Sequence, residues 1–380
     1  MYKLGAVGVG HWVMRLKRVM DTDERMNISK AVGVTWYEDK KEILDKFGIT
    51  KENYFRIEPQ QSLPEEFFDG LDVVQIASHN EFHKEQTIQS LEHEKVTVTE
   101  KTFATDRENF TEAIDFIKSN NHEKKVTVHL HYLGKILTLE LPKILSFATK
   151  EYGKITHAIG TFFEEINPED VRRNWLFRPE NGGILMDWIH PLGILSYTCK
   201  ADFIDCLEAD SYVINKDYDY INPTGAYAKF KIGGSNFTQD ALAYVRVGKG
   251  FPHGITHKTL RLVFEKNAFL DLNYISSEQE FNSELRGTWE LIEIKNGKRN
   301  VVSFGSPTGP ISYQFMLNEM IDMINGKKPS LSLDDIKRIY EPLWKFQEAT
   351  KNKEPKRDEN DIKNFIKAGL EKAADWQFMA

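Results

Sequence analysis

Short apolar runs alternate with amphipathic segments over the first third of the chain. Strands buried on both faces of a parallel sheet are apolar in this way, and the intervening segments have helical spacing. The predicted strands are Tyr2–Val9, Ser29–Trp36, Leu71–Ala77 and Val96–Thr99, and the predicted helices are Val13–Met20, Lys40–Phe47, Lys84–Leu91 and Glu108–Lys118. This alternation predicts an α/β domain, a doubly wound parallel sheet, over residues 1–122.

The pattern changes after the run Val126–His131, where longer segments of alternating polarity begin. The predicted strands are Ile155–Phe163, Tyr212–Asn215, Ala226–Ile232, Ala241–Val247, Leu260–Phe264, Phe269–Tyr274 and Trp289–Ile294. Gly233-Gly234 and Asn296-Gly297 are typical of hairpin turns. With helices at Ile136–Phe147, Tyr313–Ile324 and Leu333–Thr350, the pattern predicts an α+β domain with a large, mostly antiparallel open sheet over residues 123–350. Residues 351–380 are predicted to form a charged linker and a C-terminal helix near Ile362–Trp376.

Composition excludes several classes of protein. The 380 residues carry 50 basic and 57 acidic side chains, a net charge of -7, so we expect no nucleic-acid partner. No segment has the length and apolarity of a membrane span. Two cysteines, Cys199 and Cys206, fit reduced thiols better than a disulfide framework. We therefore expect a cytoplasmic protein without a membrane partner.

Two glycines follow the first predicted strand. Gly8 and Gly10 allow the tight turn and the close backbone approach that a pyrophosphate needs at a helix N-terminus. Val13 replaces the third glycine of the usual G-x-G-x-x-G pattern, and a plain strand–helix turn is the alternative. The position at the head of an alternating domain favours dinucleotide binding, with His11 and Trp12 beside the cofactor.

The end of the second strand bears on which dinucleotide binds. An acidic residue there would bind the adenosine ribose of NAD. Thr35 and Trp36 occupy that place here, and Lys40 follows nearby, where a 2′-phosphate would lie. The sequence thus favours NADP over NAD, the alternative being that Lys40 is a surface lysine at a helix start.

Further polar residues follow the next strands. We place Ser78, His79, Asn80 and His83 at the cofactor site, although a structural or capping role is an alternative for His83. Glu100 and Lys101 end the strand Val96–Thr99. Asp187 and His190 follow the pair Gly182-Gly183 in the second domain. A lysine, an acid and a histidine suffice for acid–base assistance of a hydride transfer.

The order and spacing of these motifs resemble a known family. The residues that carry the resemblance are Gly8 and Gly10, Ser78-His79-Asn80 with His83, Glu100-Lys101, Tyr152-Gly153-Lys154-Ile155, Trp175 with Arg178-Pro179, Gly182-Gly183 with Asp187 and His190, and Ser332-Leu333-Asp334-Asp335. Over about residues 1–350 the chain resembles the glucose–fructose oxidoreductase / inositol dehydrogenase / rhizopine-catabolism (Gfo/Idh/MocA) family.

The resemblance implies a Rossmann domain and hydride exchange between NADP or NAD and a sugar, cyclitol or related hydroxyl or carbonyl compound. It implies that Lys101 contacts the nicotinamide ribose and the reacting oxygen, that Asp187 orients the substrate, and that His190 passes a proton to or from its hydroxyl. It also implies a homodimer or homotetramer formed through the C-terminal sheet.

The sequence departs from the family pattern at two places in this set. Thr102 replaces a proline, which would remove a cis peptide and shift the tip of Lys101. Asp187 and His190 are one residue closer than in D-x-G-x-H, so we expect them to leave the usual shared face. Two alternatives therefore stay open: a non-catalytic regulator that senses NAD(P), and a glycosidase or epimerase that keeps its NAD bound.

Other residues are candidates for the substrate. His131 and Tyr132 follow the strand that joins the domains, and we expect a contact with a substrate hydroxyl or core packing. Trp175 and Arg178 would stack on a sugar or grip a carboxylate, the alternative being a surface loop. His129 and His131 share one side of a strand, but no Cys or acidic ligand has matching spacing, so no metal site is predicted.

Overall fold

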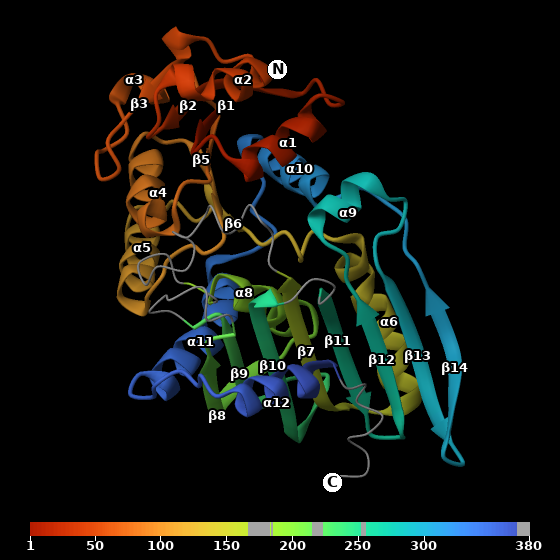
Figure 1. Cartoon of the computed structure of the whole chain (residues 1–380). Coiled ribbons are helices and arrows are strands. Elements are labelled where there is room, and N and C mark those ends of the chain that lie inside the picture. The colour runs from red at the N-terminus through yellow and green to blue at the C-terminus, as the bar shows by residue number, and fades with distance from the viewer. Residues whose placement is uncertain (166–182, 184, 215–222, 252–255, 371–380) are drawn as a thin grey trace. The chain divides into compact units, whose positions relative to one another are not determined.

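The structure, a computed structural model, describes residues 1–165, 183, 185–214, 223–251 and 256–370. The chain folds into two compact units (Figure 1). The first unit comprises Met1–Gly134 and Pro310–Lys337, and the second comprises Lys135–Gly309 and Arg338–Ala380. Each unit is built around its own sheet.

The sheet of the first unit has six strands in the order β3-β2-β1-β4-β5-β6. The strands are β1 (Tyr2–Val7), β2 (Met26–Gly33), β3 (Tyr54–Arg56), β4 (Val73–Ile76), β5 (Val96–Glu100) and β6 (Val126–His129). All neighbouring pairs are parallel. The predicted doubly wound parallel sheet is confirmed, and its strand order reverses between β1 and β4, where such sheets bind ligands.

Helices cover both faces of this sheet. They are α1 (His11–Met20), α2 (Tyr37–Phe47), α3 (Glu65–Phe68), α4 (His83–Glu92), α5 (Arg107–Ser119) and α10 (Ser312–Ile324), with short 3-10 turns at Lys51–Asn53 and Asn80–Phe82. On one face, the hydroxyl of Thr87 on α4 lies 2.7 Å from that of Thr99 on β5. On the other, Tyr313 of α10 packs edge-on against His129 of β6, with ring centroids 5.2 Å apart.

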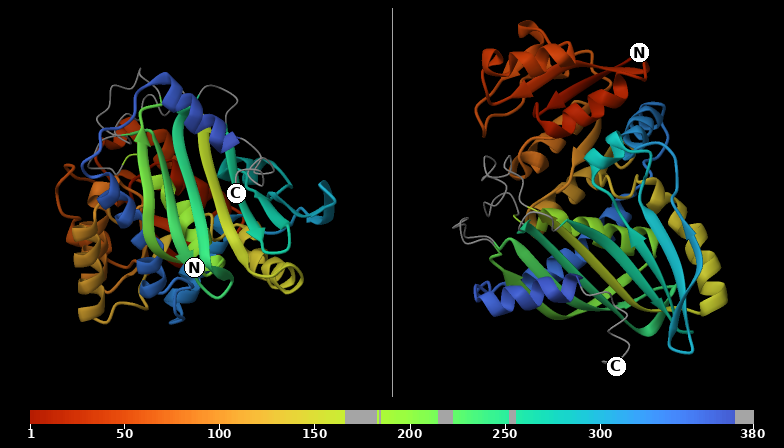
Figure 2. Two further views of the ribbon diagram at one scale, coloured as in Figure 1. Left: turned by 90° about the horizontal axis from the view of Figure 1, so that it is seen from below. Right: turned by 45° about the vertical axis from the view of Figure 1, so that its right-hand side comes forward.

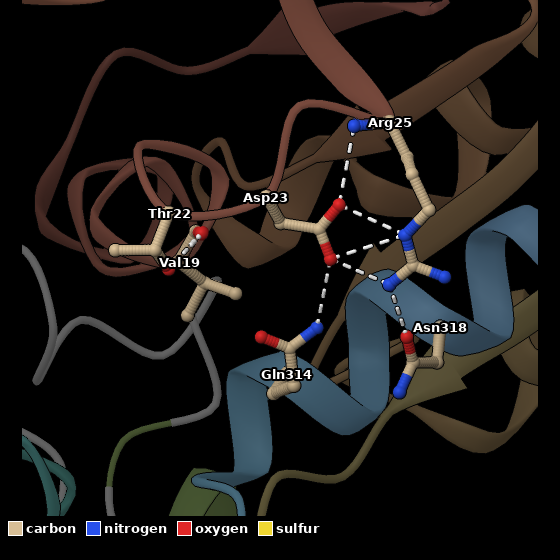
Figure 3. Close-up of polar contacts among 6 residues, drawn as sticks. All are labelled: Val19, Thr22, Asp23, Arg25, Gln314 and Asn318. Carbon is tan, nitrogen blue, oxygen red and sulfur yellow. Dashed lines mark hydrogen bonds and ion pairs between the residues drawn. The ribbon is translucent and has the colours of Figure 1, made fainter.

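Hydrogen bonds join α10 to an ion pair between Asp23 and Arg25, which precede β2 (Figure 3). Arg25 donates from Nε to Asp23 Oδ1 over 2.8 Å and from Nη2 to Asn318 Oδ1 over 2.6 Å. Gln314 donates to Asp23 Oδ2 over 3.2 Å. The hydrogen bond from Arg25 lowers the pKa of Asp23 well below its usual range, so this link is ionic at neutral pH.

The first unit therefore differs from the predicted residues 1–122. It continues to residue 134 because β6 hydrogen-bonds to β5 as a sixth strand. It also takes in residues 310–337, because α10 packs against α1 and against the sheet. Neither packing partner is evident from a segment's own hydrophobic pattern.

The second unit contains an eight-stranded sheet in the order β14-β13-β12-β11-β7-β10-β9-β8. The strands are β7 (Ile155–Glu165), β8 (Asp202–Tyr212), β9 (Gly225–Gly233), β10 (Phe237–Phe251), β11 (His257–Phe264), β12 (Ala268–Asn273), β13 (Thr288–Lys295) and β14 (Lys298–Gly305). Only the β7–β10 pair is parallel among these neighbours, which confirms the mostly antiparallel sheet. Asn296 and Gly297 form the predicted hairpin turn, with φ of 53° and 70°.

Sequence patterning failed at both edges of this sheet. The predicted strand Tyr212–Asn215 is wrong, because β8 ends at Tyr212 and begins at Asp202. The strand β14 was not predicted. Both are edge strands with little burial contrast: Ile204 and Leu207 of β8 and Phe304 of β14 expose 44%, 53% and 77% of their surface. Such strands lack the clean alternation of a half-buried strand.

Helices pack on both faces of the second sheet (Figure 2). They are α6 (Ile136–Tyr152), α8 (Leu185–Gly193, extended by a π-helical turn, Ile194–Thr198), α11 (Leu333–Thr350) and α12 (Glu359–Leu370). The short helix α9 (Ser277–Asn282) lies in the connection between β12 and β13. Pro191 of α8 approaches Gly160 of β7, where an added Cβ would lie 3.2 Å from its ring. Gly369 of α12 packs against Phe163, which also belongs to β7 but points to the other face of the sheet from Gly160. The helix α8 is thereby placed over the β7–β10 pair.

Candidate functional site

Glycine builds the turn between β1 and α1. Gly8 has a φ of +90°, and an added Cβ would lie 2.5 Å from the carbonyl oxygen of Ala77, which follows β4. At Gly10 an added Cβ would have no described atom within 4 Å, and the structure describes no side-chain cap for α1 there. The backbone of β1 and β4 therefore closes under the turn while the N-terminus of α1 stays accessible, the arrangement that suits a pyrophosphate.

The end of β2 carries the candidates for the adenosine ribose. The strand ends at Gly33, so Thr35 and Trp36 lie beyond it and the predicted extent to Trp36 is wrong. The carbonyl of Thr35 accepts a 2.7 Å hydrogen bond from the Tyr54 hydroxyl. This bond fixes the backbone and leaves Trp36 60% exposed at the start of α2, which carries Lys40.

Arg56 is a basic residue of this region that the sequence did not reveal. Its guanidinium carbon lies 4.0 Å from the centroid of the Trp36 ring, and Nη2 is 2.6 Å from Glu58 Oε1. The pairing of Gly33 with Arg56 in the β2–β3 ladder brings it to the end of β2. No local motif marks this residue, because its position depends on the pairing of a three-residue strand.

The segment after β4 is tied to the segment after Lys101. The Ser78 hydroxyl donates to Gln86 Oε1 over 2.5 Å. His83 is fully buried, with Nδ1 2.8 Å from the Thr102 carbonyl oxygen and Nε2 3.2 Å from that of Ser78. Burial lowers the pKa of His83 against the opposing effect of these carbonyls, so the ring is neutral at pH 7. The geometry matches the structural role considered for His83.

The neighbouring candidates differ in exposure. Asn80 is buried in the first turn after β4, whereas the side chain of His79 is 41% exposed and lies 3.9 Å from Glu81. Both remain predicted cofactor residues.

Lys101 lies at the end of β5 in an aromatic environment. Its side chain is buried, and Nζ lies 5.8 Å from the centroid of the Trp12 ring. Trp12 in turn lies 5.6 Å from His131, and His131 lies 4.6 Å from Tyr132, centroid to centroid. The first unit therefore brings Trp12, Lys101, His131 and Tyr132 together. The expected loss of the cis peptide is wrong, because the Lys101–Thr102 bond is cis.

Glu100 points into the core beside Lys101. Its Oε1 is 2.9 Å from His129 Nδ1, and both side chains are buried. His129 and His131 have ring centroids 6.2 Å apart. Within the part of the chain that the structure describes, no cluster of three metal-ligating side chains forms. The pair Glu100–His129 therefore fixes the end of β5 next to the end of β6.

Asp187 and His190 lie on one face of α8. Asp187 Oδ1 is 3.9 Å from His190 Nε2, and both side chains are buried. The expectation that the shorter spacing would separate them is wrong, because residues three or four apart both meet on one side of a helix. An anion beside an imidazole stabilises its protonated form, as a proton-transfer group requires.

Three further charged residues surround Asp187, and sequence reasoning missed all of them. Lys249 of β10 places Nζ 2.9 Å from Asp187 Oδ2 and 3.3 Å from Glu164 Oε2 of β7. Lys258 of β11 forms an ion pair with the other oxygen of Glu164. Burial raises the pKa of Glu164, but Lys258 and Lys249 outweigh it and hold that pKa below the usual range. We call Glu164, Asp187, Lys249 and Lys258 the charge ladder.

Two candidates fall elsewhere. Trp175 and Arg178, like Gly182 of the glycine pair, lie outside the described residues.

A polar pocket of about 270 Å³ lies between Thr161, Arg261 and Gly369. It is on the α12 face of the sheet, opposite to Asp187 and His190, and so belongs to neither cluster of candidates.

Comparison with solved structures gives likenesses over nearly the whole chain. Aldose-aldose oxidoreductase from Caulobacter crescentus, complexed with glycerol, is 14% identical with a TM-score of 0.71, covering 93% of this chain and 98% of its own. The 3-ketoreductase KijD10 from Actinomadura kijaniata, in complex with NADP and TDP-benzene, is 14% identical with a TM-score of 0.67, covering 89% and 94%. The chain has the fold of these oxidoreductases.

A third structure with this oxidoreductase fold acts on a different kind of compound. Biliverdin reductase from Synechocystis sp. PCC 6803, in complex with biliverdin and NADP+, is 18% identical with a TM-score of 0.65, covering 91% of this chain and 98% of its own. No family model matches the sequence, and no curated protein matches it. At these identities the likeness concerns the fold. Among the described helices, none is long and apolar enough to cross a membrane.

Proposed function

We propose that this protein is an NAD(P)-dependent oxidoreductase that transfers a hydride between nicotinamide and a sugar, cyclitol or related hydroxyl or carbonyl substrate. The observation that carries the proposal is the turn at Gly8, which lies at the switch point of a parallel sheet. Lys101 lies at the end of β5, two strands away from β1 in the sheet. The similar structures that hold NADP support the choice of cofactor.

The residues of the first unit fit a dinucleotide. The turn at Gly8 and Gly10 would hold the pyrophosphate, because Gly8 lets the turn close against the backbone of Ala77 and an added Cβ at Gly10 would meet no described atom. Thr35 and the exposed Trp36 would meet the adenosine. Arg56 and Lys40 would meet a 2′-phosphate, which favours NADP over NAD. The backbone around Ser78, His79 and Asn80 would lie under the nicotinamide ribose, and His11 and Glu100 complete this side of the site.

A bound nicotinamide supplies or accepts the hydride. The residues of this chain move and stabilise the proton and the charge that accompany it. Lys101 stabilises negative charge on the reacting oxygen, which develops as the hydroxyl loses its proton. The low exposure of Lys101 strengthens that interaction, because little water screens it.

Asp187 and His190 would serve the hydroxyl proton. His190 accepts the proton from the hydroxyl in oxidation and returns it in reduction. Asp187 orients the substrate and stabilises the imidazolium beside it, at 3.9 Å. We propose that His131, Tyr132, Trp175 and Arg178 contact the substrate. Glycerol in one similar structure supports a hydroxyl-rich compound.

The proposed assembly is a homodimer or homotetramer through the second sheet. Exposed apolar side chains at its two edges, Ile204, Leu207 and Phe304, favour an association of this unit. Light scattering coupled to gel filtration measures the mass directly. A monomer at all concentrations would contradict this part of the proposal.

The test has two stages. Quenching of tryptophan fluorescence measures the affinity for NADPH and NADH, and absorbance of the reduced nicotinamide then follows turnover with a panel of aldoses, ketoses and polyols. We expect tight NADPH binding and turnover of at least one substrate. Lys101→Met should lower kcat by about a hundredfold or more while the protein still binds nucleotide.

The other outcomes separate the rival functions. Binding without turnover of any substrate would contradict the proposal and favour a regulator. Cofactor that copurifies and is not consumed would favour the bound-NAD glycosidase or epimerase. Absence of binding of either nucleotide would remove the basis of the proposal.

A further inference from the structure

We infer that Lys249 is a positioning residue of the reaction: it holds the Asp187 carboxylate in the orientation and charge state in which that carboxylate controls His190. This inference rests on the proposed function for its kinetic consequences. Its structural basis lies wholly within the second unit, in the contacts between α8 and three adjacent strands.

The strand register brings the charge ladder together. Lys249 of β10 is the direct partner of Glu164 of β7 in the parallel pair of the sheet. On the other side of β7, Lys258 of β11 pairs with Phe162, two residues before Glu164. Phe162 and Glu164 point to the same face, because side chains alternate along a strand. Glu164 therefore lies between two lysines on the face that α8 covers.

The contacts connect this ladder to the helix. Lys249 Nζ forms an ion pair with Asp187 Oδ2 at 2.9 Å. The other oxygen, Oδ1, faces His190 Nε2 at 3.9 Å, which is too long for a hydrogen bond but close enough for a strong interaction between charges. Asp187 thus stands between a permanent cation and a titratable imidazole.

Burial makes the arrangement consequential. The side chains of Lys258, Asp187 and Lys249 are 8%, 10% and 15% exposed. Among the described residues, the charged and titratable groups that face Asp187 come from α8, β7, β10 and β11, namely His190, Glu164, Lys249 and Lys258. The charge ladder contributes two ammonium groups and two carboxylates, and its field on His190 depends on each member.

The role of Lys249 follows from the positive charge that it contributes to the charge ladder. With Lys249 present, the negative charge of Asp187 is partly compensated, so His190 is able to give up its proton to the substrate oxygen in reduction and to take it back in oxidation. Without Lys249, the cation that lies 2.9 Å from Asp187 Oδ2 is lost, so the field at His190 becomes more negative and the imidazolium is stabilised. Its carboxylate also loses the contact that orients it.

The experiment compares Lys249→Met with Lys249→Arg. Methionine keeps most of the side-chain volume and removes the charge, whereas arginine keeps the charge. The matched control is Lys231→Met on the neighbouring strand β9, whose lysine pairs with Asp240 at the surface. Three quantities are measured for each protein: the affinity for NADPH, the pH profiles of kcat and KM, and the pH titration of His190 by histidine-selective NMR.

The expected result for Lys249→Met is specific. NADPH affinity stays within about twofold, kcat falls about tenfold or more with a smaller change in KM, and the His190 titration midpoint moves up by about one pH unit. Lys249→Arg restores kcat to within about threefold, and Lys231→Met matches the wild type. In an Asp187→Asn background, Lys249→Met should change kcat by less than about threefold, since the carboxylate that Lys249 positions is gone.

Failure of this inference is distinguishable from failure of the proposed function. An unchanged His190 midpoint and an unchanged kcat in Lys249→Met would overturn the inference even if the enzyme is active. If the wild type turns over no substrate, the proposed function fails, and the NMR titration alone decides the inference. A full tenfold loss of kcat on Lys249→Met in the Asp187→Asn background would overturn the route through Asp187. If Lys249→Met does not fold, the same titration on Lys249→Gln decides.

Discussion

The two units hold their candidate residues by different means. In the first unit, backbone turns at strand ends and a group of rings hold Lys101: Gly8 fits under the Ala77 carbonyl, and Trp12 and His131 lie beside the lysine. In the second unit, a ladder of opposite charges across three strands holds Asp187.

The difference teaches where sequence motifs are informative. A strand-end turn is encoded by consecutive residues, so Gly8 and Lys101 stand out in the sequence. The ion pairs of the charge ladder join residues about 60 to 95 positions apart, and they exist only because of strand pairing and register. The comparison also predicts that substitutions will destabilise the two units for different reasons. In the first unit the cause is a clash with the backbone, and in the second it is a buried charge without its partner.

The largest effect is expected at a second charge pair of the second unit. Lys135 and Glu280 are 0% and 1% exposed, and Nζ lies 2.8 Å from Oε1. Lys135→Met leaves a buried carboxylate without its cation, so the free energy of unfolding should fall by about 3–5 kcal/mol in a urea titration. The control is Lys143→Met, at an exposed position of α6, the helix that Lys135 precedes. It should change the free energy of unfolding by less than about 0.5 kcal/mol.

A loss below about 1 kcal/mol in Lys135→Met would show that charge pairing is not what stabilises this unit. The double variant Lys135→Met/Glu280→Gln should recover part of the loss, because neither buried charge then remains.

The next effect tests the backbone mechanism of the first unit. Gly8→Ala forces a side chain into a left-handed conformation and against the Ala77 carbonyl, so it should cost about 1–3 kcal/mol of unfolding free energy and abolish NADPH binding. Gly10→Ala meets no described atom and should leave stability within about 0.5 kcal/mol. Its methyl group nevertheless enters the space assigned to the pyrophosphate.

The two glycine variants together separate folding from binding. We expect Gly10→Ala to weaken NADPH binding about tenfold or more without destabilising the fold. Unchanged affinity in Gly10→Ala, measured by fluorescence, would show that the pyrophosphate does not lie at this turn.

The pH dependence of stability tests the charge ladder from the acid side. Lys258 and Lys249 outweigh burial and lower the pKa of Glu164 from 4.5 to about 2. Ionised Glu164 therefore stabilises the fold above pH 4.5, and that stabilisation is lost as the pH falls from 4.5 towards 2. Denaturation of wild type and Glu164→Gln across this range should show a difference that shrinks as the pH falls. A constant difference would mean that Glu164 is not ionised in the native protein.

The smallest effect concerns the choice between NADP and NAD. Arg56→Gln should weaken NADPH binding about tenfold and leave NADH binding within about twofold, because only NADPH carries the phosphate that Arg56 would meet. Arg18→Gln, at an exposed position on α1, serves as the control. Equal losses for both nucleotides would place Arg56 at the adenine, through its stacking on Trp36, instead of at the phosphate.

The sequence predicted most of the fold, and it did so for a physical reason. The parallel strands β4 and β5 are buried along their whole length and rich in β-branched residues, and the Asn296-Gly297 turn needs positive φ, so both are visible in local composition. Edge strands such as β14 expose most of their side chains and escaped prediction. The return of α10 to the first unit depends on long-range packing that no local pattern reports.

The candidate site could also be predicted only where its residues follow a local pattern. Lys101, Asp187 and His190 were found because they follow glycine turns or strand ends. Arg56, Glu164, Lys249 and Lys258 were missed because each gains its position from a partner strand. The departures from the family pattern were misjudged in both cases: the peptide after Lys101 is cis without a proline, and a helix brings Asp187 and His190 together at the shorter spacing.

The central proposal is a hydride transfer that Lys101 and His190 assist. The most direct measurement is mass spectrometry of the product formed from NADPH deuterated at its transferable position and a panel of ketoses and aldoses, with wild type, Lys101→Met and His190→Gln. The account predicts deuterium at the new carbinol carbon with the wild type. It predicts that either variant lowers the rate of transfer by about a hundredfold or more. Bound NADPH with no deuterium in any product, or full transfer by both variants, would contradict it.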